Sequence, residues 1–136
     1  MTDTPPLVVE DLTFRYRSRT EPSIQDISLT VQAGEILLVA GASGCGKTTL
    51  MRCINGLVPR SYKGEMAGRV VVNGEDISPL PLVKISQMVG TVLQDPERQI
   101  LGTRVLAEVA FGLENLGLER EEILARAFEA MDFLGI

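Results

Sequence analysis

The most informative stretch of the sequence is Gly41-Ala42-Ser43-Gly44-Cys45-Gly46-Lys47-Thr48. It matches the pattern G-x-x-x-x-G-K-[ST] at every fixed position. The residues before it, 36–40, form a short apolar run that is typical of a buried parallel strand. The residues after it, 49–56, carry apolar side chains at helical spacing and end at a glycine, which predicts a short helix. This order of strand, glycine-rich loop and helix predicts an α/β fold.

The residue types of this loop suit a polyphosphate. Glycines let the backbone curl so that several N–H groups point at one anion, and the helix N-terminus adds further unpaired N–H groups and a positive dipole end. We expect Lys47 to supply a mobile positive charge to the β- and γ-phosphates. We expect the Thr48 hydroxyl to be a ligand of the Mg²⁺ that bridges these phosphates. Thr49 offers its hydroxyl or its backbone N–H to the α-phosphate. We therefore expect a nucleotide-phosphate site at residues 41–49.

The composition is that of one globular domain without a nucleic-acid surface. The chain has 136 residues, 45% of them hydrophobic, so it is long enough to bury a core. Its net charge is −5 and no stretch concentrates lysine or arginine, which argues against nucleic-acid binding as the main role. No apolar run approaches the ~20 residues that span a bilayer, and residues 1–6 lack the layout of a signal peptide. We expect a cytosolic chain whose membrane role comes through a partner.

The two cysteines, Cys45 and Cys53, are expected to be reduced thiols. Eight residues of helix separate such positions by about 12 Å, which is too far for a disulfide. Cys45 lies inside the loop near a helix N-terminus, where a thiolate is favoured. Two interpretations stay open: Cys45 is a reactive thiol whose alkylation blocks nucleotide binding, or it is a small residue that fits the loop.

Alternating apolar residues predict strands on both sides of the loop. Residues 7–16 and 27–31 have the pattern of an antiparallel pair. Residues 70–72 predict another strand, which the turn signal Asn73-Gly74 ends, so we interpret Asp76 as a turn residue and not as a Mg²⁺ ligand. Tyr16 keeps two interpretations, a half-buried strand aromatic or a platform on which an adenine base stacks.

A second apolar run, residues 88–94, predicts another buried strand. Asp95-Pro96 closes it, because proline disfavours the helical region for the residue before it. Gln94 thus ends this strand, where doubly wound folds place ligand groups, although its position alone favours a solvated strand end.

From Thr103 onward the spacing of apolar residues becomes helical. Two helices are expected, with Gly117 and Gly135 as their terminators. We interpret their apolar stripes as packing surfaces: Leu106, Val109, Ala110, Leu113 and Leu116 on the first helix, and Leu124, Ala127, Phe128, Met131 and Leu134 on the second.

In this order the motifs resemble the ATP-binding subunits of ATP-binding cassette (ABC) transporters. Tyr16 stands where that family has its adenine-stacking aromatic residue, residues 41–48 match its Walker A motif, and Gln94 matches its Q-loop glutamine. Residues 95–99 and 108–115 resemble the branch that serves energy-coupling-factor transporters, which import vitamins or transition-metal ions. Residues 55–66 resemble members of that branch in which two cassettes are fused in one chain.

The resemblance implies a P-loop NTPase core of the ABC type with an antiparallel β subdomain and the start of a helical subdomain. Residues 1–99 would hold the β subdomain and the core, and residues 100–136 the start of the helical subdomain. Lys47 and Gln94 would act in ATP hydrolysis, and Thr48 and Gln94 would hold Mg²⁺. The implied ATP-binding residues are Tyr16, Gly41, Ala42, Ser43, Gly44, Cys45, Gly46, Lys47, Thr48 and Thr49.

The resemblance also implies partners and a location. The helices after Gln94 would dock on a transmembrane scaffold subunit of the transporter. A second ABC ATPase domain, in another chain or fused in the same one, would complete the pair. The protein would then lie at the cytoplasmic face of the cell membrane, held there by its partners, with no nucleic acid involved.

The sequence departs from the family pattern in three motifs. It contains no signature loop beginning Leu-Ser-Gly-Gly, no Walker B aspartate followed by glutamate, and no switch histidine, and it has no histidine at all. The family pattern places all three after the point where this chain ends. We therefore expect the N-terminal part of one ATPase domain, with exposed apolar strand surface and without turnover of its own.

Other functions remain as alternatives. A small-molecule P-loop kinase would need an acceptor pocket and an arginine-rich lid, whereas the arginines after Gln94 are scattered. A cassette ATPase that works on DNA or ribosomes would need basic surface, contrary to the charge balance. A fragment that binds ATP without turnover is the third alternative.

Overall fold

The computed structural model describes residues 4–136, except the side chains of Pro96 and Arg98. Residues 1–3, part of the segment considered above for a signal peptide, lie outside the described residues. The chain divides into two compact units, one that reaches to Thr91 and one from Val92 to Ile136. Each is described by itself below.

The first unit is built on a four-stranded antiparallel sheet. The strands are β1 (Leu7–Tyr16), β2 (Ile24–Val31), β3 (Gly64–Val72) and β4 (Glu75–Asp76), in the order β2-β1-β3-β4. The predicted antiparallel pair is confirmed as β1 and β2. The predicted turn at Asn73-Gly74 is confirmed too, since both residues have positive φ angles, 51° and 82°, as a tight hairpin turn requires.

An irregularity at the middle of β1 sets which side chains face the core. Register shifts fall between Val9 and Leu12 on the β2 side and between Glu10 and Thr13 on the β3 side, and Asp11 there has a φ of 46°. The extra residue brings Val9, Leu12 and Phe14 to the same buried face, although simple alternation would separate Val9 from Leu12. Tyr16 continues this face at the end of the strand.

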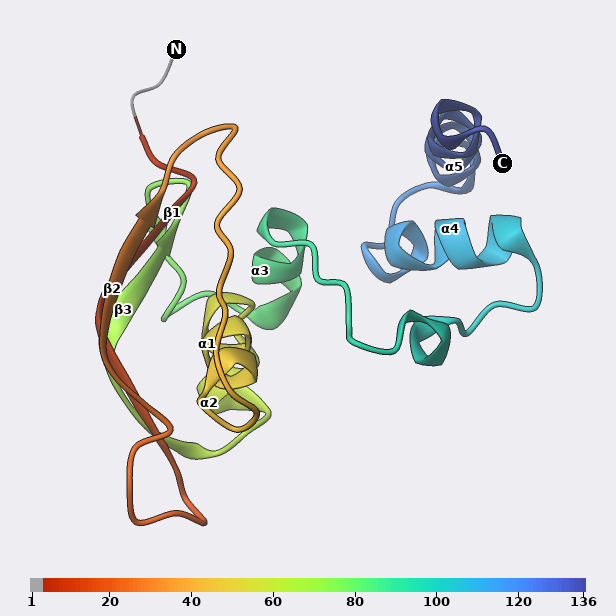
Figure 1. Cartoon of the computed structure of the whole chain (residues 1–136). Helices are drawn as coiled ribbons and strands as arrows, with labels where there is room; N and C mark the ends of the chain where they lie inside the picture. Colours follow the sequence, from red (N-terminus) through yellow and green to blue (C-terminus); the bar gives the residue numbers. More distant parts are fainter. Residues whose placement is uncertain (1–3) are drawn as a thin grey trace. The chain divides into compact units, whose positions relative to one another are not determined.

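Three helices of the first unit lie on one side of the sheet (Figure 1). They are α1 (Lys47–Ile54), α2 (Leu57–Arg60) and α3 (Leu82–Met88). Leu50 and Cys53 of α1 and Ile85 of α3 are buried together with the sheet residues in one apolar core. The helix that the sequence predicts after the loop is therefore confirmed as α1.

The second unit contains a short 3-10 helix η1 (Pro96–Gln99) and the two predicted helices, α4 (Val105–Asn115) and α5 (Arg120–Leu134). Helices α4 and α5 pack against each other through Ala110 of α4 and through Ile123 and Ala127 of α5. The predicted α5 stripe is partly wrong, because Phe128 and Leu134 are 56% and 68% exposed. The buried face of α5 is narrower because a single helix packs on it among the described residues.

Both segments that the sequence assigns to buried parallel strands form no strand, so those two predictions are wrong. Residues 36–40 and 89–94 have no regular structure, and Met88 belongs to α3. Ile36, Leu38 and Val92 are 96%, 85% and 84% exposed. A strand needs a neighbour for its backbone N–H and C=O groups, and no described residue pairs with either segment.

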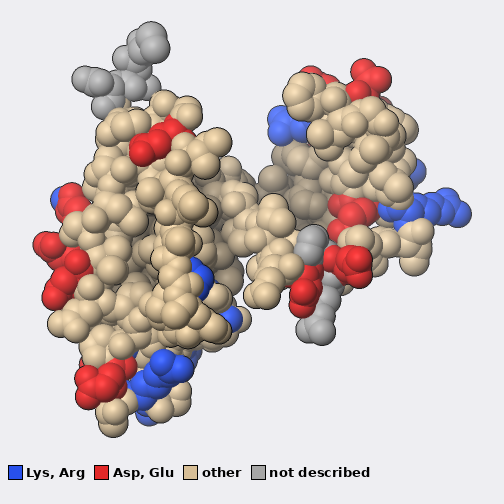
Figure 2. All heavy atoms as spheres, viewed as in Figure 1, with Lys and Arg blue, Asp and Glu red and all other residues tan. Residues whose placement is uncertain are grey.

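The sequence concentrates lysine and arginine in no single stretch, and the surface shows a matching distribution of charged side chains (Figure 2). On the face shown in Figure 2, Lys and Arg side chains are interspersed with Asp and Glu rather than gathered into one basic area. Among residues 4–136, the structure contains no helix of the length and apolarity that crossing a membrane demands.

Candidate functional site

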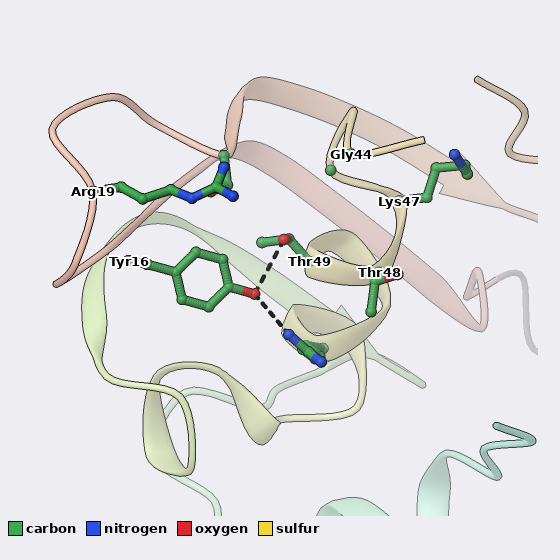
Figure 3. Close-up of a pocket in the computed structure, with 9 residues that line it drawn as sticks. Tyr16, Arg19, Gly44, Lys47, Thr48 and Thr49 are labelled. Carbon is green, nitrogen blue, oxygen red and sulfur yellow. Dashed lines mark hydrogen bonds between the residues drawn. The ribbon is translucent and has the colours of Figure 1, made fainter. Parts of the chain in front are cut away.

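The glycine-rich loop curls tightly in front of α1 (Figure 3). Gly44 and Gly46 have φ angles of 81° and 100°, which residues with a side chain rarely adopt. The N–H of Cys45 donates back to the Ala42 carbonyl at 3.3 Å, and the N–H of Leu50 donates to the Gly46 carbonyl at 2.9 Å, within the first turn of the helix. The loop therefore ends at the N-terminus of α1, where unpaired N–H groups are available to an anion.

Gly46 is held against the strand below it. A Cβ atom at this position would lie 2.4 Å from the Ser23 carbonyl oxygen and 2.7 Å from a methyl group of Ile24. The absence of a side chain thus lets the loop pack directly on the beginning of β2. This contact fixes the loop on the sheet.

A cavity of about 340 Å³ opens beside the loop. It joins residues of the loop and α1 to residues of the β1–β2 connection, although these are about thirty positions apart in the sequence. Its lining consists of Tyr16, Arg19, Ser23, Gly44, Gly46, Lys47, Thr48, Thr49 and Arg52. Three of these residues are cationic and none is acidic, so the cavity attracts anions although the chain as a whole is negative.

Lys47 lies folded back on the loop. Its Nζ donates to the carbonyl oxygens of Gly41 and Ala42, both at 2.7 Å, and lies 3.6 Å from the Cys45 sulfur. In Figure 3 its side chain extends on the loop side of the cavity, away from Tyr16. The ammonium group is therefore held by carbonyl oxygens of the loop itself.

Tyr16 has the packing of a half-buried strand aromatic and also lines the cavity, and its stacking on adenine stays a prediction. Its ring packs edge-on against Phe14, with centroids 4.8 Å apart and an interplanar angle of 84°, as a half-buried strand aromatic does. The same ring lines the cavity. Its hydroxyl exchanges a hydrogen bond with the Thr49 hydroxyl at 3.1 Å and accepts one from Arg52 Nη1 at 3.1 Å (Figure 3).

The Thr49 hydroxyl is therefore engaged with Tyr16. Of the two groups that Thr49 was expected to offer to an α-phosphate, the hydroxyl is in use and the backbone N–H remains. Thr48, one residue earlier, lines the cavity. Four loop residues that were predicted to bind ATP do not line the cavity: Gly41, Ala42, Ser43 and Cys45.

Gln94 lies in the second unit, at an exposed bend. The strand that was expected to carry it is absent, as described above. The neighbouring Leu93 N–H donates to the Gln99 side-chain oxygen at 3.2 Å, so this segment is tied to η1.

Asp76 was interpreted as a turn residue, but it belongs to β4, where it pairs with Val71 directly after the Asn73-Gly74 turn. Its carboxylate accepts the N–H of Ser78 at 2.8 Å. The hydrogen bonds from Ser78 lower the pKa of Asp76 below its usual value, because they stabilise the charged form.

Sequence reasoning missed Arg19, Ser23 and Arg52. Arg52 carried a usable signal, since it lies three and four residues after Thr49 and Thr48 and so shares their helix face. Arg19 and Ser23 belong to the irregular β1–β2 connection, whose course no local pattern predicts. The Ser23 Oγ atom is buried and has no hydrogen-bond partner among the described residues.

The two cysteines differ in access, which gives a direct test of Cys45. Cys45 is exposed, whereas Cys53 is buried in the core, and burial raises the pKa of Cys53 to about 12. We expect N-ethylmaleimide to modify Cys45 alone, and Mg-ATP to slow that modification by about tenfold or more. Peptide mass spectrometry with and without nucleotide measures both. Equal labelling of Cys45 in the two samples would favour the interpretation that it merely fits the loop.

Comparison with known proteins identifies the family. The family model described as ABC transporter matches residues 24–135. An ABC transporter ATP-binding protein of Treponema denticola is 41% identical over 128 residues, which are 94% of this chain and 26% of that protein. One of Lactiplantibacillus plantarum is 46% identical over 111 residues, 82% of this chain and 20% of that protein. The chain thus spans about a quarter of these relatives or less.

Solved structures agree. The structure of cbiO1 from Clostridium perfringens, described as part of the ABC transporter complex cbiONQ, superposes with a TM-score of 0.79 at 30% identity and covers 98% of this chain and 52% of that chain. A bacterial Atm1-family ABC exporter with ATP bound gives a TM-score of 0.62 at 25% identity, over 82% of this chain and 18% of that chain. With the family match over most of its length, the chain belongs to the ABC transporter family of ATP-binding proteins.

Proposed function

We propose that this chain is part of the ATP-binding subunit of an ABC importer of the energy-coupling-factor type and binds Mg-ATP in the cavity beside the loop. The observation that carries the proposal is the cavity itself, which unites a curled glycine loop, a helix N-terminus and an aromatic ring. The transporter type is supported by the likeness to cbiO1, which covers more of the chain than the likeness to the exporter does. The import direction is proposed from the resemblance of residues 95–99 and 108–115 to the energy-coupling-factor branch.

In this proposal the nucleotide extends from the loop to Tyr16. The backbone N–H groups of residues 41–49 surround the phosphates, and Lys47 exchanges the carbonyls of Gly41 and Ala42 for the β- and γ-phosphate oxygens. The ring of Tyr16 that lines the cavity stacks on adenine. Thr49 contributes its backbone N–H, because its hydroxyl is bonded to Tyr16.

The residues present fit a magnesium ion that arrives with the nucleotide. Mg²⁺ in such sites is held by one or two protein oxygens together with phosphate oxygens and water. Thr48 lines the cavity, and its hydroxyl would supply one such oxygen. Gln94 is proposed as a second ligand and as a contact of the attacking water. When bound, the ion neutralises charge on the phosphates during transfer.

The proposal includes the domain organisation and the partners. Residues 1–99 hold the β subdomain and the P-loop core, and residues 100–136 the start of the helical subdomain that docks on a transmembrane scaffold subunit. A second ABC ATPase domain pairs with this one. The protein acts at the cytoplasmic face of the membrane through these partners.

Turnover is expected only in a longer chain. Hydrolysis needs a completed Mg²⁺ clamp and a positioned water, and this chain offers half of that machinery. We expect residues 1–136 to bind Mg-ATP in calorimetry but to release no phosphate over multiple turnovers. A chain that also carries the signature loop, the Walker B residues and the switch histidine is expected to hydrolyse ATP steadily.

Three outcomes would count against this. Calorimetry without Mg-ATP binding would refute the proposed site. Steady phosphate release by residues 1–136 that Lys47→Ala abolishes would refute the claim that the chain alone lacks turnover. An extended chain that hydrolyses ATP but does not copurify with a coexpressed scaffold subunit would favour one of the non-transport functions.

A further inference from the structure

Arg52, which lines the cavity, is the centre of a side-chain cluster on the cavity wall. The cluster consists of Tyr16, Thr49, Arg52 and Tyr62. Arg52 Nη1 donates to the Tyr16 hydroxyl at 3.1 Å, and the Arg52 guanidinium carbon lies 4.0 Å from the centre of the Tyr62 ring. The Thr49 hydroxyl forms a hydrogen bond with the Tyr16 hydroxyl at 3.1 Å. Arg52 therefore touches both tyrosines of the chain at once.

These contacts hold the Tyr16 ring at two places. Phe14 packs edge-on against the ring, and the hydroxyl at its tip is bonded to two side chains of α1. A tyrosine without such bonds is free to rotate about its side-chain torsions, which costs stacking affinity when a ligand must select one orientation. The cluster removes that freedom before any ligand binds.

The position of Tyr62 relative to Tyr16 is fixed by the backbone. The N–H of Tyr62 donates to the Leu57 carbonyl at 3.1 Å, and the N–H of Arg17 donates to the Lys63 carbonyl at 3.1 Å. Gly64 pairs directly with Tyr16 in the sheet, and a Cβ atom at Gly64 would lie 2.3 Å from the Arg15 carbonyl oxygen. These backbone bonds place Tyr62 beside Arg52, whose guanidinium lies over the Tyr62 ring.

We propose that Arg52 is a positioning residue for the base of the nucleotide. It holds Tyr16 in the stacking orientation and couples that ring to α1, the helix whose first residues bind the phosphates. The proposal rests on the proposed function. It differs from a role as one more phosphate cation, because the guanidinium is already committed to the Tyr16 hydroxyl and the Tyr62 ring.

The test compares a ligand that has a base with one that lacks it. In calorimetry with Mg-ATP and with Mg-tripolyphosphate, we expect Arg52→Met to weaken ATP binding by about tenfold and to change tripolyphosphate binding by less than about twofold. Arg52→Lys keeps a cation and a donor but lacks the planar guanidinium that lies over the Tyr62 ring, so it is expected to recover only part of the ATP affinity. Arg126→Met, which removes the same charge from an exposed ion pair with Glu122, should change neither ligand.

A double-mutant cycle separates positioning from general stability. Tyr16→Phe removes the hydroxyl and keeps the ring, so the bond to Arg52 is lost in that background. We expect Arg52→Met to cause less than about twofold further loss of ATP affinity there, because the two changes remove one interaction. Additive losses would overturn the proposal.

The remaining outcomes are also decisive. Equal losses of affinity for ATP and for tripolyphosphate would show that Arg52 contacts the phosphates. Unchanged ATP affinity would show that Arg52 has no role in binding. Either result overturns the inference and leaves the proposed function intact. Absence of ATP binding by the unmodified chain would instead refute the proposed function. If Arg52→Met fails to fold, Tyr62→Leu removes the supporting ring outside the cavity, and it is expected to lower ATP affinity by about threefold without affecting tripolyphosphate.

Discussion

Replacement of Lys47 by alanine is expected to weaken Mg-ATP binding by about 100-fold or more. Lys47 is the single cation of the loop, and its Nζ bonds two neutral carbonyls. Binding replaces these with charged phosphate oxygens, and charge-assisted hydrogen bonds of this kind are about twice as strong as neutral ones. Calorimetric titration of the variant and the unmodified chain measures the difference.

The variant should remain folded, which makes the result interpretable. The carbonyls of Gly41 and Ala42 lie in an exposed loop, so water replaces the ammonium group there at little cost. Lys84→Ala is the matched control, because it removes the same charge from an exposed pair with Glu75 outside the cavity. Unchanged ATP affinity in the Lys47 variant would mean that the loop does not hold the phosphates.

The parts of the fold that the sequence predicts are those with local signals. The alternation in β1 and β2, the Asn73-Gly74 turn and the glycines after α4 and α5 are properties of a few adjacent residues. The missed helix α3 is only seven residues long and buries Ile85 alone, so its apolar pattern is too short to distinguish from a strand. Met88 was assigned to a strand for this reason.

The two wrong strands show where local reasoning ends. An apolar run predicts burial, but burial needs a partner surface and strand pairing needs a neighbouring backbone. Residues 36–40 and 89–94 have neither among the described residues and leave Ile36 and Val92 in solvent. The expectation that such exposed apolar segments promote association therefore stands as a prediction for this chain.

The candidate site was predictable where a motif fixes its chemistry. The loop pattern led to Lys47 and Thr48, and the family resemblance led to Tyr16; the structure brings all three to one cavity. Arg52 is different, because its importance depends on Tyr16 and Tyr62, which come from other parts of the chain. Only tertiary structure brings such contacts together, and Arg19 and Ser23 were missed for the same reason.

Replacement of Gly46 by alanine is expected to damage both the fold of the first unit and its ligand binding. The φ angle of 100° costs an alanine about 1–2 kcal/mol, and the new Cβ would meet the Ser23 carbonyl oxygen at 2.4 Å. That atom belongs to the backbone, so the loop has to move away from β2. We expect the free energy of unfolding to fall by about 3 kcal/mol or more, and Mg-ATP affinity by about 30-fold or more, because the amides lose their convergence.

Gly34→Ala separates the collision from the backbone strain. Gly34 has a φ of 78° with no atom within 4 Å of its would-be Cβ, so this variant bears the cost of the angle alone, about 1 kcal/mol, and keeps its ATP affinity. Urea unfolding followed by tyrosine fluorescence reports the first unit selectively, since the chain has no tryptophan and both tyrosines, Tyr16 and Tyr62, lie there. Equal losses of stability and of ATP affinity in the two variants would show that the loop shifts at Gly46 without further cost. The close packing of the loop on β2 would then not determine the geometry of the phosphate site.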